Sequence, residues 1–408
     1  MTSFKFSKNE LSDTTVALAC ALAFGGVSGC IILFGLIGAA NKSFAASIAV
    51  RLAIIGLLIV PILMRRIRRP DSITVLFYIW GGIYLLKVLF EVIAPSQVYF
   101  QEPGEKGIYF LVFVALPFLL LSCYKPKDPD KAAKHIFWFI VASCGVFGVL
   151  STFGLREYIG HAGRITQMRS AGAEYVSPLT LAYVSALSLV LATWGLLNGP
   201  SARARAVLWS VIIFSLAPFI LGASRGAVLS LAACFVLLLA QKRGAKKAVI
   251  ASLAVAATGI GLYALNNAVG GEAFVRLFSI SDDIDRGASS AIRLGVWEEA
   301  LGIALQKPFW GGGLEVPSVG MHPHNIIVEA FMALGIFGGA LLVFLLLRLA
   351  LLGKSPILNN SALGWVPLVL AWATVQHMFS GAVYGASWLA VGSALVIVFS
   401  RSCKKKKT

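Results

Sequence analysis

Long apolar segments follow one another through nearly the whole chain, and they constrain its fold more than any other feature. A helix that crosses a bilayer needs roughly 20 apolar residues. Charged residues make up only 13% of the chain, against about a quarter in soluble proteins. We therefore predict an all-α integral membrane protein, one polytopic domain over 1–408. Its twelve expected transmembrane helices lie near residues 16–39, 47–64, 73–95, 107–123, 135–154, 178–197, 205–222, 225–241, 247–266, 325–350, 362–379 and 384–400.

The basic residues predict the orientation of these helices. The formal net charge of +17 comes from short clusters between apolar segments, such as Arg65–Arg69, Lys242–Lys247 and Lys404–Lys407. Such clusters are typical of cytoplasmic connections and of contacts with anionic membrane lipids, and they do not indicate nucleic-acid binding. We expect both termini and most of the 35 basic residues on the cytoplasmic side of the membrane.

Two longer connections fall on the opposite, periplasmic side, near residues 155–177 and 267–324. Connections as long as the second usually carry function. Apolar residues at helical spacing predict a short amphipathic helix from Ser289 to Leu305 inside it. Pro308 would end that helix, and Gly311–Gly313 would form a flexible turn before the next span.

Several arginines are predicted on the periplasmic side, where topology does not require them. Arginine is planar and always charged, so it suits bidentate contact with phosphate. Arginines converging on one cavity would fit a pyrophosphate; alternatively, each could snorkel to lipid phosphates or pair with Asp282, Asp283 or Asp285. The arginines concerned are Arg164, Arg169, Arg225, Arg286 and Arg293.

Ser224 and Arg225 lie in a very short predicted turn between two spans. The Ser224 hydroxyl is expected to cap the following helix, which leaves Arg225 beside free backbone N–H groups at a helix N-terminus. This arrangement predicts an anion site at the membrane surface. Snorkelling of Arg225 to the interface is the alternative.

His322-Pro323-His324-Asn325 is expected to open the tenth span, with Pro323 in its first turn. The positive potential of a helix N-terminus keeps an imidazole neutral, and a neutral imidazole can take a proton from a sugar hydroxyl. The alternatives are a polar cap without chemistry and a zinc site. No third metal ligand is evident, so we predict neither a metal nor another cofactor.

Other polar groups have simpler interpretations. Glu298 and Glu299 could act as an acid or base, but a solvated face or a pair with Arg293 is favoured. Lys87 and Glu91, four residues apart on one helix, predict an ion pair rather than a proton relay. The six cysteines show neither zinc-site spacing nor a disulfide framework.

Taken in order, these motifs resemble one known family. His324-Asn325 is followed after nine residues by Gly335-Ile336-Phe337-Gly338, and Ser224-Arg225-Gly226 precedes them. Between them come Arg293, Trp297, Pro308 and Gly311–Gly313, while Arg169 with Ser177-Pro178 matches less closely. The sequence resembles the O-antigen ligase and polymerase superfamily of bacterial envelope glycan enzymes.

The resemblance implies a multi-spanning, GT-C-like glycosyltransferase that moves a polysaccharide from undecaprenyl pyrophosphate to a sugar hydroxyl of lipid A–core. Transfer would invert the anomeric carbon without a metal, with His324 as general base and arginines on the pyrophosphate. The implied catalytic residues are His324, Arg225 and Arg293. The residues implied to bind pyrophosphate or acceptor are Arg169, Arg164, Arg286, His322, Asn325, Ser224 and Trp297.

The position of the histidine motif after one dominant external connection favours a ligase over a polymerase. Arg286, fifteen residues before Gly302, matches an arginine–glycine spacing of polymerases, although chance matches are common in a chain with 40 glycines. A protein oligosaccharyltransferase of the same superfamily stays open. So does a flippase for lipid-linked glycans, but such transporters place charged sites near the bilayer midplane.

Overall fold

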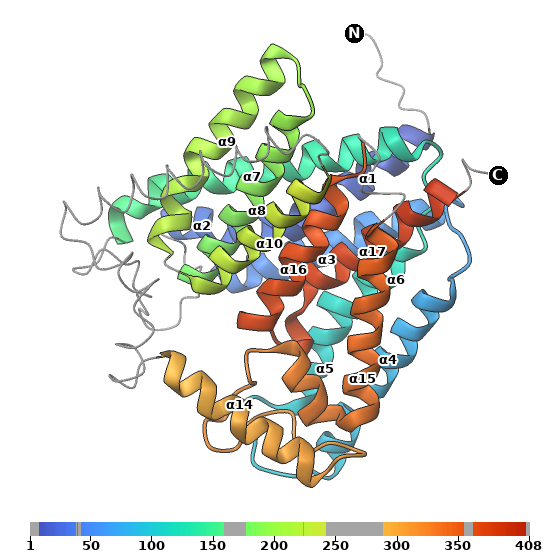
Figure 1. Ribbon diagram of the computed structural model, residues 1–408, viewed down its shortest axis with the longest axis vertical. Coiled ribbons are helices and arrows are strands. Elements are labelled where there is room, and N and C mark those ends of the chain that lie inside the picture. Colours follow the sequence, from blue (N-terminus) through green and yellow to red (C-terminus); the bar gives the residue numbers. More distant parts are fainter. Residues whose placement is uncertain are drawn as a thin grey trace. The chain divides into compact units, whose positions relative to one another are not determined.

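In the structure, a computed structural model, every named secondary-structure element within the described residues is a helix (Figure 1). The described residues are 8–37, 39, 42–158, 177–222, 224–241, 289–354 and 362–404. Within them, eight helices are long and apolar enough to cross a membrane, so the chain is a multi-pass membrane protein. The eight candidate spans are Glu10–Leu36, Ala45–Leu63, Ser72–Ile93, Pro103–Ser122, Pro129–Phe153, Pro178–Leu197, Ala202–Ile220 and Ile326–Gly353.

Three shorter helices coincide with further predicted spans. Arg225–Gln241 and Ser387–Arg401 are apolar but short, and α16 (Trp365–Ser380) has 16 residues. The predicted span at 247–266 lies outside the described residues, as do most of 155–177 and the first part of 267–324. The number twelve therefore stays a prediction.

The chain forms two compact units. The first takes Met1–Arg66, Pro126–Ser279 and Ile357–Trp372, and the second takes Ile67–Lys125, Ile280–Pro356 and Ala373–Thr408. The first unit contains α1 (Lys8–Ala21), the π-helical η1 (Leu22–Gly26), α2 (Val27–Leu36), α3 (Ser43–Leu63), α7 (Pro129–Tyr158), α8 (Pro178–Leu197), α9 (Ala202–Leu221), α10 (Arg225–Gln241) and the start of α16.

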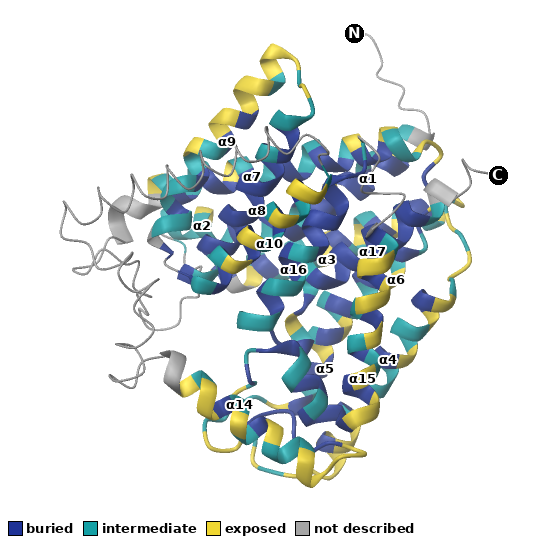
Figure 2. Ribbon diagram, viewed as in Figure 1, coloured by how far each residue is buried: buried dark blue, intermediate teal, exposed yellow. Residues whose placement is uncertain are grey.

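Helix α8 forms the centre of the first unit and is buried over most of its length (Figure 2). Ser177 caps its first turn by accepting a hydrogen bond from the Thr180 N–H, and Pro178 occupies the first helical position. The indole of Trp372 donates to the Tyr183 carbonyl at 2.9 Å, which joins α16 to α8. Aromatic packing and a buried indole bond thus hold this unit together.

The second unit contains α4 (Ser72–Ile93), α5 (Pro103–Tyr109), the π-helical η3 (Phe110–Ala115), α6 (Leu116–Ser122), α14 (Ser289–Gln306), α15 (Ile326–Lys354), the end of α16, the 3-10 turn η4 (Val383–Gly385) and α17 (Ser387–Lys404). Asp71 caps α4 and pairs with Arg401 of α17. The Trp80 indole of α4 donates to the Gly338 carbonyl of α15 at 3.1 Å. The Trp80 bond ties α4 to α15, whose N-terminus carries the histidine motif.

Candidate functional site

Asn325, rather than Pro323, opens α15. Its side-chain oxygen accepts hydrogen bonds from the backbone N–H groups of Ile327 and Val328, at 3.0 and 3.2 Å. The helix therefore begins at Ile326. The prediction that Pro323 lies in the first turn is wrong, because asparagine caps a helix well and takes that role two residues later.

His324 adopts a left-handed backbone conformation, with φ of 58°. This region is unfavourable for a residue with a side chain, and it persists only where neighbouring contacts enforce it. Here the Trp297 indole N–H donates to the Pro323 carbonyl at 2.7 Å on one side, and the Asn325 cap holds the other. Trp297 thus holds the histidine segment in place.

Two histidines and a tyrosine form one aromatic group. The rings of His322 and His324 lie 4.3 Å apart between centroids, edge to face. The Tyr384 ring lies 5.7 Å from the His322 ring, and the Tyr384 hydroxyl is 3.5 Å from His322 Nδ1. Burial raises the pKa of Tyr384 above its usual value, so this hydroxyl stays protonated and can donate to His322.

Both imidazoles are neutral at physiological pH. Burial, together with the smaller effect of the positive charge of Arg293, lowers the pKa of His324 to about 4. Burial likewise lowers the pKa of His322 to about 3, helped by His324, Lys106 and Arg293. A neutral imidazole can accept a proton, so the site contains a group able to act as a general base.

Arg293 belongs to α14 and is half-buried. One guanidinium nitrogen, Nη1, donates to the Phe379 carbonyl at the end of α16, at 2.8 Å. This contact directs the arginine toward the histidine segment, where its charge is felt by both rings. A cation beside a neutral base is an arrangement that can bind and stabilise an anion.

Glycines allow the segment before the histidines to pack against α15. Gly335 interrupts α15 with φ of 67°, and a Cβ there would lie 2.5 Å from the Phe309 carbonyl oxygen. The Ile336 N–H donates to the Pro308 carbonyl at 2.7 Å, and the Gly312 N–H donates to the Met332 carbonyl at the same distance. Gly311–Gly313, expected to form a flexible turn, are buried instead, and a Cβ on Gly311 would clash with the Ala333 carbonyl of α15.

The comparison with protein families fits this geometry. A family model described as O-antigen ligase matches residues 209–343. We call the matched residues 209–343 the O-antigen ligase family domain. No curated protein and no solved structure matches the chain significantly.

The O-antigen ligase family domain contains most of the predicted site residues, and the second unit brings five of them together. These are Arg293, Trp297, His322, His324 and Asn325. Ser224 and Arg225 belong to the first unit, where the Ser224 hydroxyl accepts from the Ala227 N–H at 3.3 Å as the predicted cap of α10. Arg164, Arg169 and Arg286 lie outside the described residues.

Other sequence predictions are confirmed. The predicted helix Ser289–Leu305 is α14, which ends at Gln306, just before Pro308. Lys87 and Glu91 form the predicted helical ion pair at 2.8 Å. Glu299, for which a solvated face or a pair with Arg293 was the favoured interpretation, accepts hydrogen bonds from the backbone and hydroxyl of Ser318, which tie α14 to the segment before the histidines.

A buried ion pair beside the ligase family histidines was missed. Lys106 of α5 and Glu315 are both almost fully buried, with Nζ 2.6 Å from Oε1. Glu315 also accepts from the backbone N–H groups of Phe100 and Gln101. The Lys106 ammonium lies 6.0 Å from the centre of the Tyr384 ring. Neither residue belongs to a local motif, so sequence alone gave no signal for the pair.

Glu329 was missed as well. This buried carboxylate, in the first turn of α15, accepts from the Val383 N–H at 3.0 Å and so holds the turn that carries Tyr384. A carboxylate inside an apolar span is itself a signal of function, and that signal could have identified it. In the part of the chain that the structure describes, no cluster of three His, Cys, Asp or Glu side chains has metal-binding geometry.

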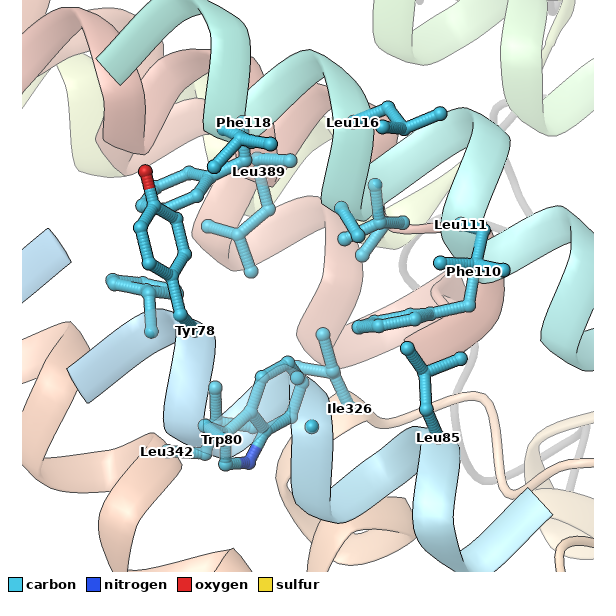
Figure 3. A pocket seen from close by; sticks show the side chains of 18 residues that line it. Tyr78, Trp80, Leu85, Phe110, Leu111, Leu116, Phe118, Ile326, Leu342 and Leu389 are labelled. Carbon is cyan, nitrogen blue, oxygen red and sulfur yellow. The ribbon is translucent and has the colours of Figure 1, made fainter. Parts of the chain in front are cut away.

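An apolar cavity of about 270 Å³ lies next to the first turn of α15 (Figure 3). Aromatic and leucine side chains of α4, η3 and α6, with Leu342 of α15 and Leu389 of α17, surround it. Ile326, directly after the Asn325 cap, forms part of its wall. A cavity lined in this way suits an aliphatic chain rather than a sugar.

Proposed function

We propose that this protein is an O-antigen ligase, which transfers a polysaccharide from undecaprenyl pyrophosphate to a sugar hydroxyl of lipid A–core. The ligase family domain supports transfer of a lipid-linked glycan of the ligase or polymerase type. One observation carries the proposal: a neutral, half-buried His324 lies beside the cation Arg293, within this domain. A base and a cation are the two groups that such a transfer needs.

The reaction is a direct displacement. His324 takes the proton of the acceptor hydroxyl, whose oxygen attacks the anomeric carbon of the donor. The bond from that carbon to the pyrophosphate oxygen breaks, and the configuration at the carbon inverts. Arg293, with the predicted Arg225, Arg164, Arg169 and Arg286, stabilises the charge of the leaving pyrophosphate. No metal or other cofactor enters this scheme.

The part of the donor's polyprenyl chain next to the pyrophosphate would fit the cavity behind Ile326. This cavity is lined almost entirely by apolar side chains, and its wall is continuous with the capped start of α15. A chain held there would put its pyrophosphate near the histidine segment. His322, Asn325, Trp297 and Ser224 are proposed to orient the substrates around the reacting atoms.

The distribution of basic residues supports the orientation proposed for the membrane. Clusters such as Arg65–Arg69 and Lys404–Lys407 would face the cytoplasm, and the segments 155–177 and 267–324 would face the periplasm. The acceptor, a component of lipopolysaccharide, is presented on that outer side. Both termini would then be cytoplasmic and the active site periplasmic, in the inner membrane.

A choice of acceptors separates this proposal from its alternatives. Purified protein is given undecaprenyl-pyrophosphate polysaccharide together with lipid A–core, a peptide, or a second donor molecule. A ligase produces glycan-capped lipid A–core alone. A product only on peptide would indicate a protein oligosaccharyltransferase, and chain extension only would indicate a polymerase. Movement of donor across vesicles without covalent product would indicate a flippase.

A further inference from the structure

The C-terminal end of α14 exposes large apolar side chains although it lies outside the membrane-spanning helices. Leu305 is 81% exposed, Phe309 61% and Trp310 86%, and Leu301 is exposed beside them. Figure 2 shows exposed residues along this helix. Contiguous apolar residues of this size on a surface mark a contact with another apolar phase. We call Leu301, Leu305, Phe309 and Trp310 the α14-end patch.

This patch is continuous with a surface that belongs to a candidate membrane span. The Pro308 carbonyl accepts from the Ile336 N–H of α15, and the Phe309 and Phe337 rings lie 6.2 Å apart. Ile336 and Phe337 are themselves exposed, inside the span Ile326–Gly353. The exposed apolar surface of α15 therefore runs directly onto the α14-end patch.

The lipid-facing part of α15 begins at its kink. Before Gly335, the side chains of α15 are buried or half-buried, and Val328 and Met332 pack against α14 and the segment that follows it. After Gly335, its exposed apolar residues are Ile336, Phe337, Phe344, Leu347 and Leu351. The stretch from Gly335 to Gly353 would cover roughly 28 Å at 1.5 Å per residue, close to the roughly 30 Å hydrocarbon core of a bilayer.

Helix α14 approaches this boundary along α15. At the middle of α14, the Trp297 indole reaches the Pro323 carbonyl, before α15 begins. After its end, Phe309 meets α15 beyond the kink, at Phe337. The C-terminal end of α14 is therefore at the level where α15 enters the lipid. Tryptophan and other aromatic residues are enriched at that level of a bilayer.

We propose that the α14-end patch is inserted into the headgroup region of the outer leaflet, with Leu305, Phe309 and Trp310 in contact with phospholipid chains. Helix α14 then connects the outer leaflet to the histidine segment, because Arg293 and Trp297 lie on the same helix, closer to its N-terminus. Contact with lipid does not depend on the proposed function. The inference that this contact also sets the height of the active site above the membrane rests on the proposed function.

Tryptophan fluorescence of the full-length protein in phosphatidylcholine vesicles tests this proposal. The emission of the wild type minus that of Trp310→Phe gives the contribution of Trp310, and the substitution keeps an exposed apolar ring. Phospholipids brominated near the top of their acyl chains should remove most of that contribution, more than lipids brominated deeper. Aqueous iodide should have little effect.

Two matched substitutions calibrate the measurement. Trp209, exposed on the candidate span of α9, should be quenched by brominated lipid, as read from Trp209→Phe. Trp297, bonded to Pro323, should be protected, as read from Trp297→Phe. The proposal is overturned if brominated lipid leaves the Trp310 emission unchanged. Quenching by iodide would then show that Trp310 faces water. Protection from iodide would show that another protein surface, such as a second copy, covers it. Neither result depends on glycan transfer.

Discussion

At the scale of single residues, His324 combines an unfavourable backbone conformation with a pKa far from that of free histidine. Pro323 is held by the Trp297 indole and Asn325 caps the next helix, so His324 is fixed between two anchored neighbours. Burial and the charge of Arg293 keep its imidazole neutral. Both features fit a base that must be in place and unprotonated before its substrate arrives.

The transfer rate should decrease in acid only at an unusually low pH. Because the pKa of His324 is lowered to about 4, the imidazole stays neutral as pH falls from 7 to 5, and the rate should hold. The rate should fall to half near pH 4, where the ring becomes protonated. Initial rates at saturating donor and acceptor measure this. An acid limb near pH 6.5, the value for free histidine, would contradict it.

The buried pair of Lys106 and Glu315 should contribute to stability asymmetrically. Lys106→Ala leaves the Glu315 carboxylate buried without its partner, a loss that costs about 3–5 kcal/mol in comparable pairs. The double variant Lys106→Met with Glu315→Gln removes both charges and should be less destabilised than Lys106→Ala. Thermal unfolding in detergent measures both. Equal melting temperatures for the single and double variants would show that the buried charge is not the cause.

At the scale of elements, the kink of α15 decides where the preceding segment can pack. Gly335 takes a positive φ, which glycine alone adopts readily, and it lets the carbonyls of Pro308 and Phe309 approach α15 closely. Gly311 and Gly312 make the matching close approach from the other side. These glycines therefore allow the segment after α14 to pack closely on α15.

Gly335→Ala should therefore destabilise the protein. The added Cβ would lie 2.5 Å from the Phe309 carbonyl and would force a left-handed conformation that costs about 1–3 kcal/mol. Gly302→Ala is the matched control, because nothing lies within 4 Å of a Cβ at that position of α14. We expect a lower melting temperature for Gly335→Ala alone. The same melting temperature in both variants would argue against a packed kink.

At the scale of the whole molecule, the sequence predicted the membrane class, α14 and the residues of the histidine segment. These features leave strong local patterns, such as apolar length and the spacing of His324, Asn325 and Gly335. Lys106, Glu315 and Tyr384 could not be predicted in the same way. They come from three separate parts of the chain, and only packing brings them to the histidines.

The predicted topology can be tested on the whole protein in cells. In a background without native cysteines, Met321→Cys should react with a membrane-impermeant maleimide added outside spheroplasts. Lys127→Cys, on an exposed connection predicted to be cytoplasmic, should react only after permeabilisation. The physical reason is the excess of basic residues in cytoplasmic connections. Labelling of Lys127→Cys from outside, with Met321→Cys protected, would reverse the orientation.

The central claim is that His324 is the base for transfer of a lipid-linked glycan. Its most direct test is capped lipid A–core formed by purified His324→Ala from undecaprenyl-pyrophosphate polysaccharide, with His135→Ala of α7 as the control. Both variants must first elute as folded protein with a wild-type melting temperature. We predict that His324→Ala forms no product while His135→Ala transfers at the wild-type rate. Transfer at the wild-type rate by His324→Ala would contradict this account of the site.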